Sequence, residues 1–352
     1  MTQVTFKTNN REISIGDDLQ THFVAEIGLN HNGSLDLAKG LVIEAAKSGV
    51  TIVKFQKRFP EKLATREFLD SPFMKCPLFG STQREVRERL ELTLIEYKEL
   101  EAYTNSLGIL FCASVFDLES LHFIQNLSNP IVKIASHSIT NGPLLESIAK
   151  TDLPVICSVG GADESEIDAA YEILKSSPLV LLHCVSSYPT TDDLIKLDTI
   201  TYLKEKYGVP VGFSSHEQGI DVSIAATILG ACIVERHFTY NRAMVGLDHS
   251  ISLTPAEFAE MIIRTRRLEK VRGVKKELFS AELAARNNYH VGLYTIRSMK
   301  KGEYIKREDI ACLQPLNSST EFFTGLEIDV VIDKAISKNL TAGQQISRNA
   351  VK

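Results

Sequence analysis

The chain has 352 residues, which is long for one ordinary domain and suits one large domain followed by a small one. Hydrophobic residues make up 44% of it, so a sizeable core can form and disorder is disfavoured. The net charge of −5, without any polybasic run, argues against a nucleic-acid partner. An anionic substrate would therefore need local positive charge from a lysine, an arginine or a metal ion.

The N-terminal segment 1–16 is polar and lacks the apolar core of a signal peptide. No run of about 18 apolar residues occurs, so no membrane span is predicted. The six cysteines form no CxxC pair, and four of them lie in apolar runs, where a thiol behaves as a small buried hydrophobe. Reduced thiols in a cytoplasmic protein are therefore favoured over disulfides or a structural zinc site.

Short apolar runs alternate with amphipathic segments along most of the chain. Strands are predicted at Phe23–Ile27, Ile52–Phe55, Leu110–Cys112, Ile131–Ala135, Pro154–Ser158, Val180–Cys184, Val211–Ser214 and Cys232–Glu235. Helices are predicted at Leu35–Ser48, Leu94–Leu107, Leu118–Gln125, Asn141–Lys150, Glu164–Lys175, Leu194–Lys206 and Gly219–Leu229. A doubly wound α/β sheet could give this alternation. The count of eight, and polar residues at the C-terminal ends of nearly all strands, favour a (β/α)8 TIM barrel with its site at that face.

The insert Arg58–Glu91 follows the second predicted strand, and its mixed composition predicts a loop over the barrel mouth. The barrel domain is expected to span 1–272 and to close with the helix Ala256–Lys270. The charged stretch 273–288 is then interpreted as a linker. The last segment, 289–352, lacks helical periodicity and predicts a small β-rich domain, too short for much core of its own and expected to pack on another surface.

Two lysines interrupt predicted strands. Lys54 in IVKFQ and Lys133 in IVKIAS occupy strands that should be almost wholly apolar, because barrel strands are buried on both faces. Burying an unpaired lysine is costly. The functional interpretation is a pair of cations that hold a phosphate or a carboxylate, helped by serines at the strand ends. The alternative is two internal salt bridges, for instance to Glu26 and Glu235. Two lysines at matching positions favour the functional interpretation.

Two histidines follow the seventh and eighth predicted strands, which are neighbours in a barrel. The side chains of His216 and His237 could therefore converge on one ion. Two neutral imidazoles with water and substrate oxygens suit a divalent cation, with Mn²⁺ favoured and Mg²⁺ or Co²⁺ as alternatives. A single histidine is more often an ordinary hydrogen-bonding residue of the core, and spacing alone leaves both interpretations open.

Two carboxylates, Glu26 and Asp248, are further candidate site residues. Glu26 ends the first predicted strand and is the candidate general acid or base, although it could also neutralise Lys54. Asp248 follows the eighth strand and could accept hydrogen bonds from a polyol. It also lies two residues after Gly246, and the local pattern slightly favours a plain turn residue.

At this point the sequence resembles a known family, the N-acetylneuraminate (sialic acid) synthases and their relatives. The motifs that carry the resemblance cover nearly the whole chain and are Ala25–Gly33, Val53–Gln56, Val132–Ser136, Leu182–Cys184, Ser186–Pro189 and Glu235–Thr239. The C-terminal stretches Met299–Glu303 and Arg307–Ile310 look like the family's antifreeze-like (SAF) domain.

The resemblance implies a metal-dependent condensation of phosphoenolpyruvate with the open-chain aldehyde of an N-acylated hexosamine, giving a 2-keto-3-deoxy sugar acid and phosphate. It implies Mn²⁺ on His216 and His237, with Glu26 as the acid or base. The positions that match phosphoenolpyruvate-binding residues are Lys54, Lys133, Ser136, Ser158, Ser186 and Ser214. The positions expected to face the sugar are Tyr188, Asp248, Gln56, Ser138 and Gln314. Family members are also domain-swapped dimers, so a homodimer is expected.

The sequence departs from the family pattern near the acceptor. Ser138 stands where the family usually has a glutamate, Ser215 where it has an aspartate, and Gln314 where the small domain usually brings an arginine. We therefore expect an acceptor other than plain N-acetylmannosamine. The alternatives are a catalytically silent relative that binds a ligand without turnover, and a different barrel aldolase that forms a Schiff base on Lys133.

Overall fold

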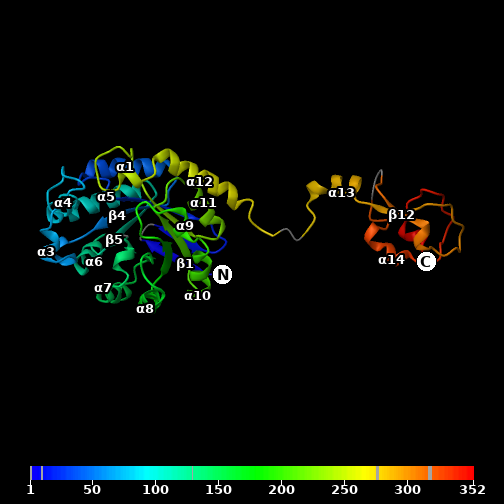
Figure 1. Ribbon diagram of the computed structural model, residues 1–352, viewed down its shortest axis with the longest axis horizontal. Coiled ribbons are helices and arrows are strands. Elements are labelled where there is room, and N and C mark those ends of the chain that lie inside the picture. The colour runs from blue at the N-terminus through cyan, green and yellow to red at the C-terminus, as the bar shows by residue number, and fades with distance from the viewer. Residues whose placement is uncertain (1, 9–10, 129, 275–276, 316–318) are drawn as a thin grey trace. The chain divides into compact units, whose positions relative to one another are not determined.

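The chain folds as two compact units, Met1–Arg272 and Gly273–Lys352 (Figure 1). The computed structural model describes residues 2–8, 11–128, 130–274, 277–315 and 319–352. No helix within these ranges is long and apolar enough to cross a membrane. All six cysteines are free thiols, and only Cys312 is exposed.

The first unit contains a closed barrel of parallel strands, so the predicted (β/α)8 TIM barrel is confirmed. Its strands are β3 His22–Gly28, β4 Ile52–Lys57, β5 Leu110–Val115, β6 Ile131–Ile134, β7 Val155–Ser158, β8 Leu179–Cys184, β9 Val211–Ser215 and β10 Ile233–His237. Almost every strand residue is buried, as expected of strands that are covered on both faces. The register aligns Glu26 with Lys54 and Ser114 with Lys133, which brings polar side chains to one end of the barrel.

Helices surround the strands (Figure 1). They are α1 Leu35–Lys47, α5 Leu94–Ser106, α6 Leu118–Ile124, α7 Gly142–Ala149, α8 Glu164–Leu174, α9 Asp192–Ile195, α10 Thr199–Tyr207, α11 Asp221–Ile228 and α12 Pro255–Glu269. Helix α5 begins with a capping box between Thr93 and Glu96, which explains its sharp start. The predicted single helix Leu194–Lys206 is wrong, because Lys196 adopts a left-handed conformation (φ +50°) that separates α9 from α10.

A hairpin that the sequence analysis did not predict covers the N-terminal end of the barrel. It consists of β1 Gln3–Thr8 and β2 Arg11–Gly16, which pair antiparallel. Its buried Phe6, Ile13 and Ile15 pack into a cluster with the residues that begin the barrel strands. Alternating apolar residues were the available signal, but polar neighbours obscured it. Closure of this end leaves the opposite end for ligands.

The insert Arg58–Glu91, predicted as a loop, contains three short helices: α2 Pro60–Leu63, α3 Arg66–Leu69 and α4 Gln83–Arg89. Thr82 caps α4 by accepting a hydrogen bond from the Glu85 amide. The insert has a small apolar cluster that also includes Leu29 and packs against Leu247, which follow β3 and β10. It therefore packs against loops at the mouth of the barrel.

The second unit has its own structure. Strand β11 Gly292–Thr295 pairs antiparallel with β12 Ile310–Leu313, and the short helices are α13 Leu283–Tyr289 and α14 Ile328–Val331. Helix α13 lies in the stretch that was expected to be only a linker. The expectation of too little core is also wrong, because nine buried apolar side chains form one cluster. Its members are Leu293, Met299, Ile305, Phe323, Val331, Ile336, Leu340, Ile346 and Ala350.

Candidate active site

A cavity of about 350 Å³ opens at the C-terminal ends of the barrel strands. Its lining includes every predicted site residue of the first unit except Ser138. The lining residues are Glu26, Leu29, Lys54, Gln56, Ser114, Phe116, Lys133, Ala135, Ser136, His137, Ser158, Cys184, Ser186, Tyr188, Ser214, His216, Glu235, His237 and Asp248. The structure thus brings together side chains from all eight strands or the loops that follow them.

Both lysines are buried, and both have carboxylate partners. The Nζ atom of Lys54 lies 2.9 Å from Glu26 Oε2 and 3.3 Å from Glu235 Oε1, whereas Lys133 Nζ lies 3.7 Å from Glu235 Oε1. The internal salt bridges considered from the sequence therefore exist. They do not remove the lysines from the cavity wall, where two cations and two carboxylates form one buried cluster.

In this cluster, burial and the neighbouring charges shift the pKa values of Lys54 and Glu235 in opposite directions. Burial lowers the pKa of Lys54, but the carboxylates of Glu235 and Glu26 outweigh it and raise the pKa above its usual value. Burial alone would raise the pKa of Glu235, but Lys133 and Lys54 hold it well below its usual value. Lys54 and Glu235 are consequently ionised at neutral pH.

Serine hydroxyls lie beside the lysines. Lys133 Nζ donates to Ser158 Oγ at 2.6 Å, and Lys54 Nζ donates to Ser114 Oγ at 3.2 Å. Gly160 lies against Ser136 and Ser186, because a Cβ atom there would come within 2.9 Å and 2.7 Å of their hydroxyl oxygens. A larger residue would therefore displace these hydroxyls from the cavity.

Glu26 has two polar neighbours. Its carboxylate pairs with Lys54 and accepts a hydrogen bond of 2.7 Å from Gln56 Nε2. Gly28 has φ +55°, and a Cβ atom there would lie 2.8 Å from Glu26 Oε1. Glycine is therefore required next to this carboxylate on two grounds, backbone conformation and space.

His216 directly follows β9 and His237 ends the neighbouring strand β10, and their ring centroids are 5.5 Å apart. Burial lowers the pKa of His216 to about 3, and His237 adds to the effect, so the His216 ring is neutral at physiological pH. His216 Nδ1 contacts the Val185 carbonyl at 3.4 Å, while His237 Nδ1 is buried without a hydrogen-bond partner and lies 4.0 Å from Asp248 Oδ2.

This arrangement fits a metal ion for which the protein supplies only some of the ligands. The neutral imidazole of His216 and the unpartnered ring nitrogen of His237 are suitable donors. Within the described residues, however, no group of three histidine, cysteine, aspartate or glutamate side chains is placed to hold a metal. The pair His216 and His237 would therefore need water or substrate oxygens as further ligands.

Two of the predicted sugar-facing residues border the histidines. The exposed ring of Tyr188 lies against His216, with centroids 4.0 Å apart. Asp248 precedes a short 3-10 helix, His249–Ile251, but its side chain does not cap that helix. Its carboxylate lines the cavity instead, so the turn interpretation alone does not account for it.

One predicted residue of the first unit is not brought to this cavity. Ser138 is buried in the short 3-10 helix Ser136–Ser138 and is not among the lining residues. Gln314 belongs to the second unit and donates to the Asn288 carbonyl at 2.9 Å. The sequence analysis missed His137, which lines the cavity and stacks on Phe116 with centroids 4.9 Å apart. Its position next to Ser136 was the available signal.

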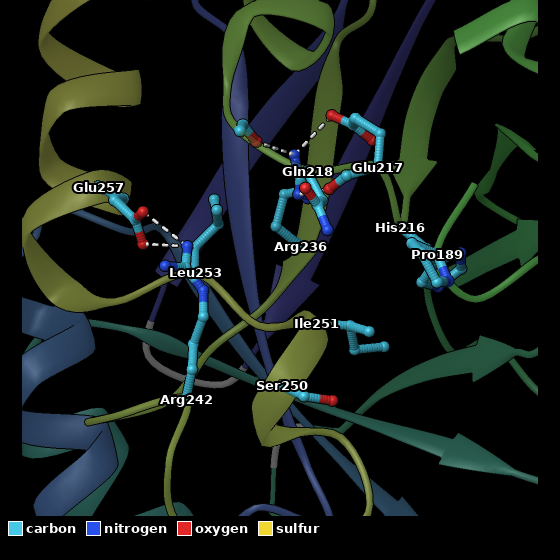
Figure 2. Close-up of a pocket in the computed structure, with 11 residues that line it drawn as sticks. Pro189, His216, Glu217, Gln218, Arg236, Arg242, Ser250, Ile251, Leu253 and Glu257 are labelled. Atoms are coloured by element: carbon cyan, nitrogen blue, oxygen red, sulfur yellow. Dashed lines mark hydrogen bonds and ion pairs between the residues drawn. The ribbon is translucent and has the colours of Figure 1, made fainter. Parts of the chain in front are cut away.

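A second pocket of about 500 Å³ shares His216 with the first (Figure 2). Figure 2 shows Arg236 and Glu217 pairing on one side of it, while Arg242 and Glu257 pair on another. Arg236 and Glu217 are almost completely buried, so this pair supports the pocket wall from within.

The NeuB family model matches residues 41–277. The N,N'-diacetyllegionaminic acid synthase of Campylobacter jejuni is 34% identical over 327 residues, covering 91% of this chain and 97% of the relative. The N-acetylneuraminate-9-phosphate synthase of Homo sapiens is 34% identical over 290 residues, covering 81% of this chain and 80% of the relative.

A solved structure agrees with these relatives. The N-acetylneuraminic acid (sialic acid) synthetase of Leptospira borgpetersenii serovar Hardjo-bovis, in complex with citrate, matches with a TM-score of 0.69 and 35% identity, covering 81% of this chain and 98% of that one. The family model spans more than half of the chain, and the named relatives cover more than two thirds of it. The chain therefore belongs to the NeuB family of sugar-acid synthases, as its motifs predicted.

Proposed function

We propose that this protein condenses phosphoenolpyruvate with an N-acylated hexosamine or a related aldose, forming a 2-keto-3-deoxy sugar acid of the sialic acid type and releasing phosphate. The observation that carries the proposal is the lysine–serine cluster in the same cavity as the histidine pair. The relatives named as legionaminic acid and N-acetylneuraminate-9-phosphate synthases support the same product class.

Lys54 and Lys133 would hold the phosphate and carboxylate of phosphoenolpyruvate. Lys133 is the freer of the two, because its nearest carboxylate oxygen is 3.7 Å away, whereas Lys54 has two carboxylates within 3.3 Å. The hydroxyls of Ser136, Ser158, Ser186 and Ser214 would complete the hydrogen bonds to the ligand.

His216 and His237 would hold a divalent cation, with Mn²⁺ favoured and Mg²⁺ or Co²⁺ as alternatives. When bound, such an ion supplies Lewis acidity toward the aldehyde oxygen of the acceptor. Asp248 and Tyr188 border the same pair and would contact the acceptor.

Glu26 would move the protons. In the proposed reaction, C3 of phosphoenolpyruvate forms a bond to the aldehyde carbon, and the aldehyde oxygen takes up a proton. Water then adds at C2, and phosphate leaves as the C2–O bond breaks, which gives the 2-keto acid. Glu26, which Lys54 and Gln56 contact, would accept the proton from that water.

The proposal also covers the identity of the acceptor sugar and the oligomeric state of the protein. The departures at Ser138 and Gln314 support an acceptor other than plain N-acetylmannosamine. We further propose a cytoplasmic homodimer in which the small domain of one subunit covers the barrel of its partner.

Phosphate release tests the proposal directly. The purified protein is incubated with phosphoenolpyruvate, Mn²⁺ and a panel of aldoses and N-acylated hexosamines, with acceptor-free and chelator-treated samples as controls. We expect acceptor-dependent phosphate release that chelation abolishes. An absence of release with every acceptor and every metal tried would exclude the proposed function.

A further inference from the structure

Beside the active-site cavity lies another pocket, about 440 Å³ in volume, between the barrel mouth and the insert. We call it the outer pocket, and its lining residues are Gln56, Arg58, Leu63, Ala64, Thr65, Phe68, Arg87, Phe116 and His137. Gln56, Phe116 and His137 line both cavities. The two cavities are therefore adjacent, and these three side chains lie where they meet.

The outer pocket is positively charged. Two arginines line it, and none of the described residues in its lining is acidic. Arg58 Nε pairs with Glu91 at 3.0 Å, but the same carboxylate also pairs with Lys57 Nζ at 3.0 Å. One carboxylate thus serves two cations, and Arg87 adds a third positive charge that Glu91 cannot balance.

Arg58 has unused hydrogen-bonding capacity. It is only 7% exposed, and its Nη2 atom is buried without a hydrogen-bond partner among the described residues. A buried guanidinium nitrogen without an acceptor is costly, and an anion in the pocket would offset that cost.

Arg87 lies on α4 and is half-buried, with its guanidinium carbon 5.3 Å from the centre of the Phe68 ring. Burial lowers the pKa of Arg87, and the positive charge of Arg58, which lines the same pocket, lowers it further. His137 experiences the same field, because burial and then Arg87, Arg58 and Lys133 all lower its pKa. An anion between these groups would relieve the repulsion.

We propose that Arg58 and Arg87 form an anion subsite that binds an acidic group on the acceptor sugar, a phosphate or a carboxylate remote from the aldehyde. This inference rests on the proposed function and specifies its acceptor class. The aldehyde end lies in the active-site cavity, the middle of the sugar contacts Gln56, and the acidic end reaches the two arginines. Planar guanidinium groups suit this role because they bind phosphate and carboxylate through paired hydrogen bonds.

The kinetic test compares three acceptors: an aldose 6-phosphate, the matching hexuronic acid and the neutral aldose. We expect kcat/KM to be higher for at least one acidic acceptor, and Arg87→Gln to lower it by about tenfold to a hundredfold, mainly through KM, as expected when a charged hydrogen bond is lost. The kcat/KM of Arg87→Gln for the neutral aldose should differ little from that of the wild type. Preference between phosphate and carboxylate identifies the acidic group.

Arg89→Gln is the matched control, because Arg89 is an exposed arginine on the same helix that does not line the outer pocket. It should leave all three kcat/KM values unchanged. Equal use of neutral and acidic acceptors by the wild type, or an equal loss with both in Arg87→Gln, would overturn the subsite while leaving the proposed function intact.

A binding measurement keeps the inference testable if no acceptor reacts, a result that would count against the proposed function itself. Glucitol 6-phosphate and glucitol have no aldehyde and cannot condense, so calorimetry can be run with phosphoenolpyruvate present to fill its own position. We expect the phosphate ester alone to bind, and Arg87→Gln but not Arg89→Gln to weaken it by about tenfold or more. Equal binding of both polyols, or unchanged binding in Arg87→Gln, would refute the subsite.

Discussion

Arg236 and Glu217 form a fully buried ion pair, and each is the sequence neighbour of one of the two site histidines. Arg236 Nη1 lies 2.5 Å from Glu217 Oε1, and Nη2 donates to the Glu217 carbonyl at 2.6 Å. The same guanidinium donates to Ser223 and to the Gly219 carbonyl. The pair therefore fixes the chain that follows His216 against the strand that ends in His237.

Replacing Arg236 with Met should destabilise the barrel by about 3–5 kcal/mol, because Glu217 would be left buried and unpaired. Urea unfolding measures the loss. Arg242→Met is the control, since Arg242 and its partner Glu257 are partly exposed and their pair is worth about 0–1 kcal/mol. The double variant Arg236→Met/Glu217→Leu should recover part of the stability. A loss no greater than that of the control would contradict this account of the pair.

The variant His237→Ala should be folded but inactive, because the proposed metal site would keep only one protein ligand, His216. Circular dichroism tests the fold, phosphate release tests activity, and electron paramagnetic resonance of added Mn²⁺ tests metal binding. Normal turnover by this variant in the presence of a chelator would show that the metal role assigned to His237 is wrong.

Lys133→Met should raise the KM for phosphoenolpyruvate and lower kcat/KM by about tenfold to a hundredfold, as expected for one lost charged hydrogen bond. Glu235 keeps Lys54 as a partner in this variant, so the fold should survive. Lys133→Arg should restore part of the activity, because it keeps the charge. An unchanged KM would show that Lys133 does not bind phosphoenolpyruvate and serves only in the salt bridge with Glu235. Borohydride trapping with a carbonyl substrate should label no lysine.

His31 should make stability depend on pH. Burial, and then the charge of Arg58, lower the pKa of His31 from 6.5 to about 4 in the folded protein. The unfolded chain therefore takes up a proton first, so stability is full above about pH 6.5 and falls as the pH drops toward 4. His31→Gln removes this contribution, which is about 3 kcal/mol across the window. Urea unfolding at pH 7 and pH 4.5 should show a smaller difference in the variant than in the wild type; equal differences would contradict the pKa shift.

Sequence and structure agree most closely where the signal is local. Short runs of apolar residues predicted all eight barrel strands, and polar residues at their ends predicted the cavity that contains Lys54, Lys133, His216 and His237. This worked because a barrel buries both faces of each strand, so a polar residue there is exceptional. The motifs likewise predicted membership of the sialic acid synthase family, which the NeuB family match confirms.

Agreement is weaker where conformation depends on partners that are distant in the chain. The helices of the insert, the break at Lys196 and the N-terminal hairpin have weak local signals and depend on packing against other elements. The core of the second unit was likewise underestimated, because nine residues scattered over the segment assemble only on folding.

The amino-acid sequence by itself determined the barrel, the family and the membership of most of the site, because those follow from periodicity and residue type. Tertiary structure decided which of the possible charge pairs form. It paired Lys54 with two carboxylates, joined Arg236 to Glu217 beneath the histidines, and placed Arg58 and Arg87 around one pocket. The physical reason is that the energy of a charge depends on its neighbours in space, which come from strands and loops far apart along the chain.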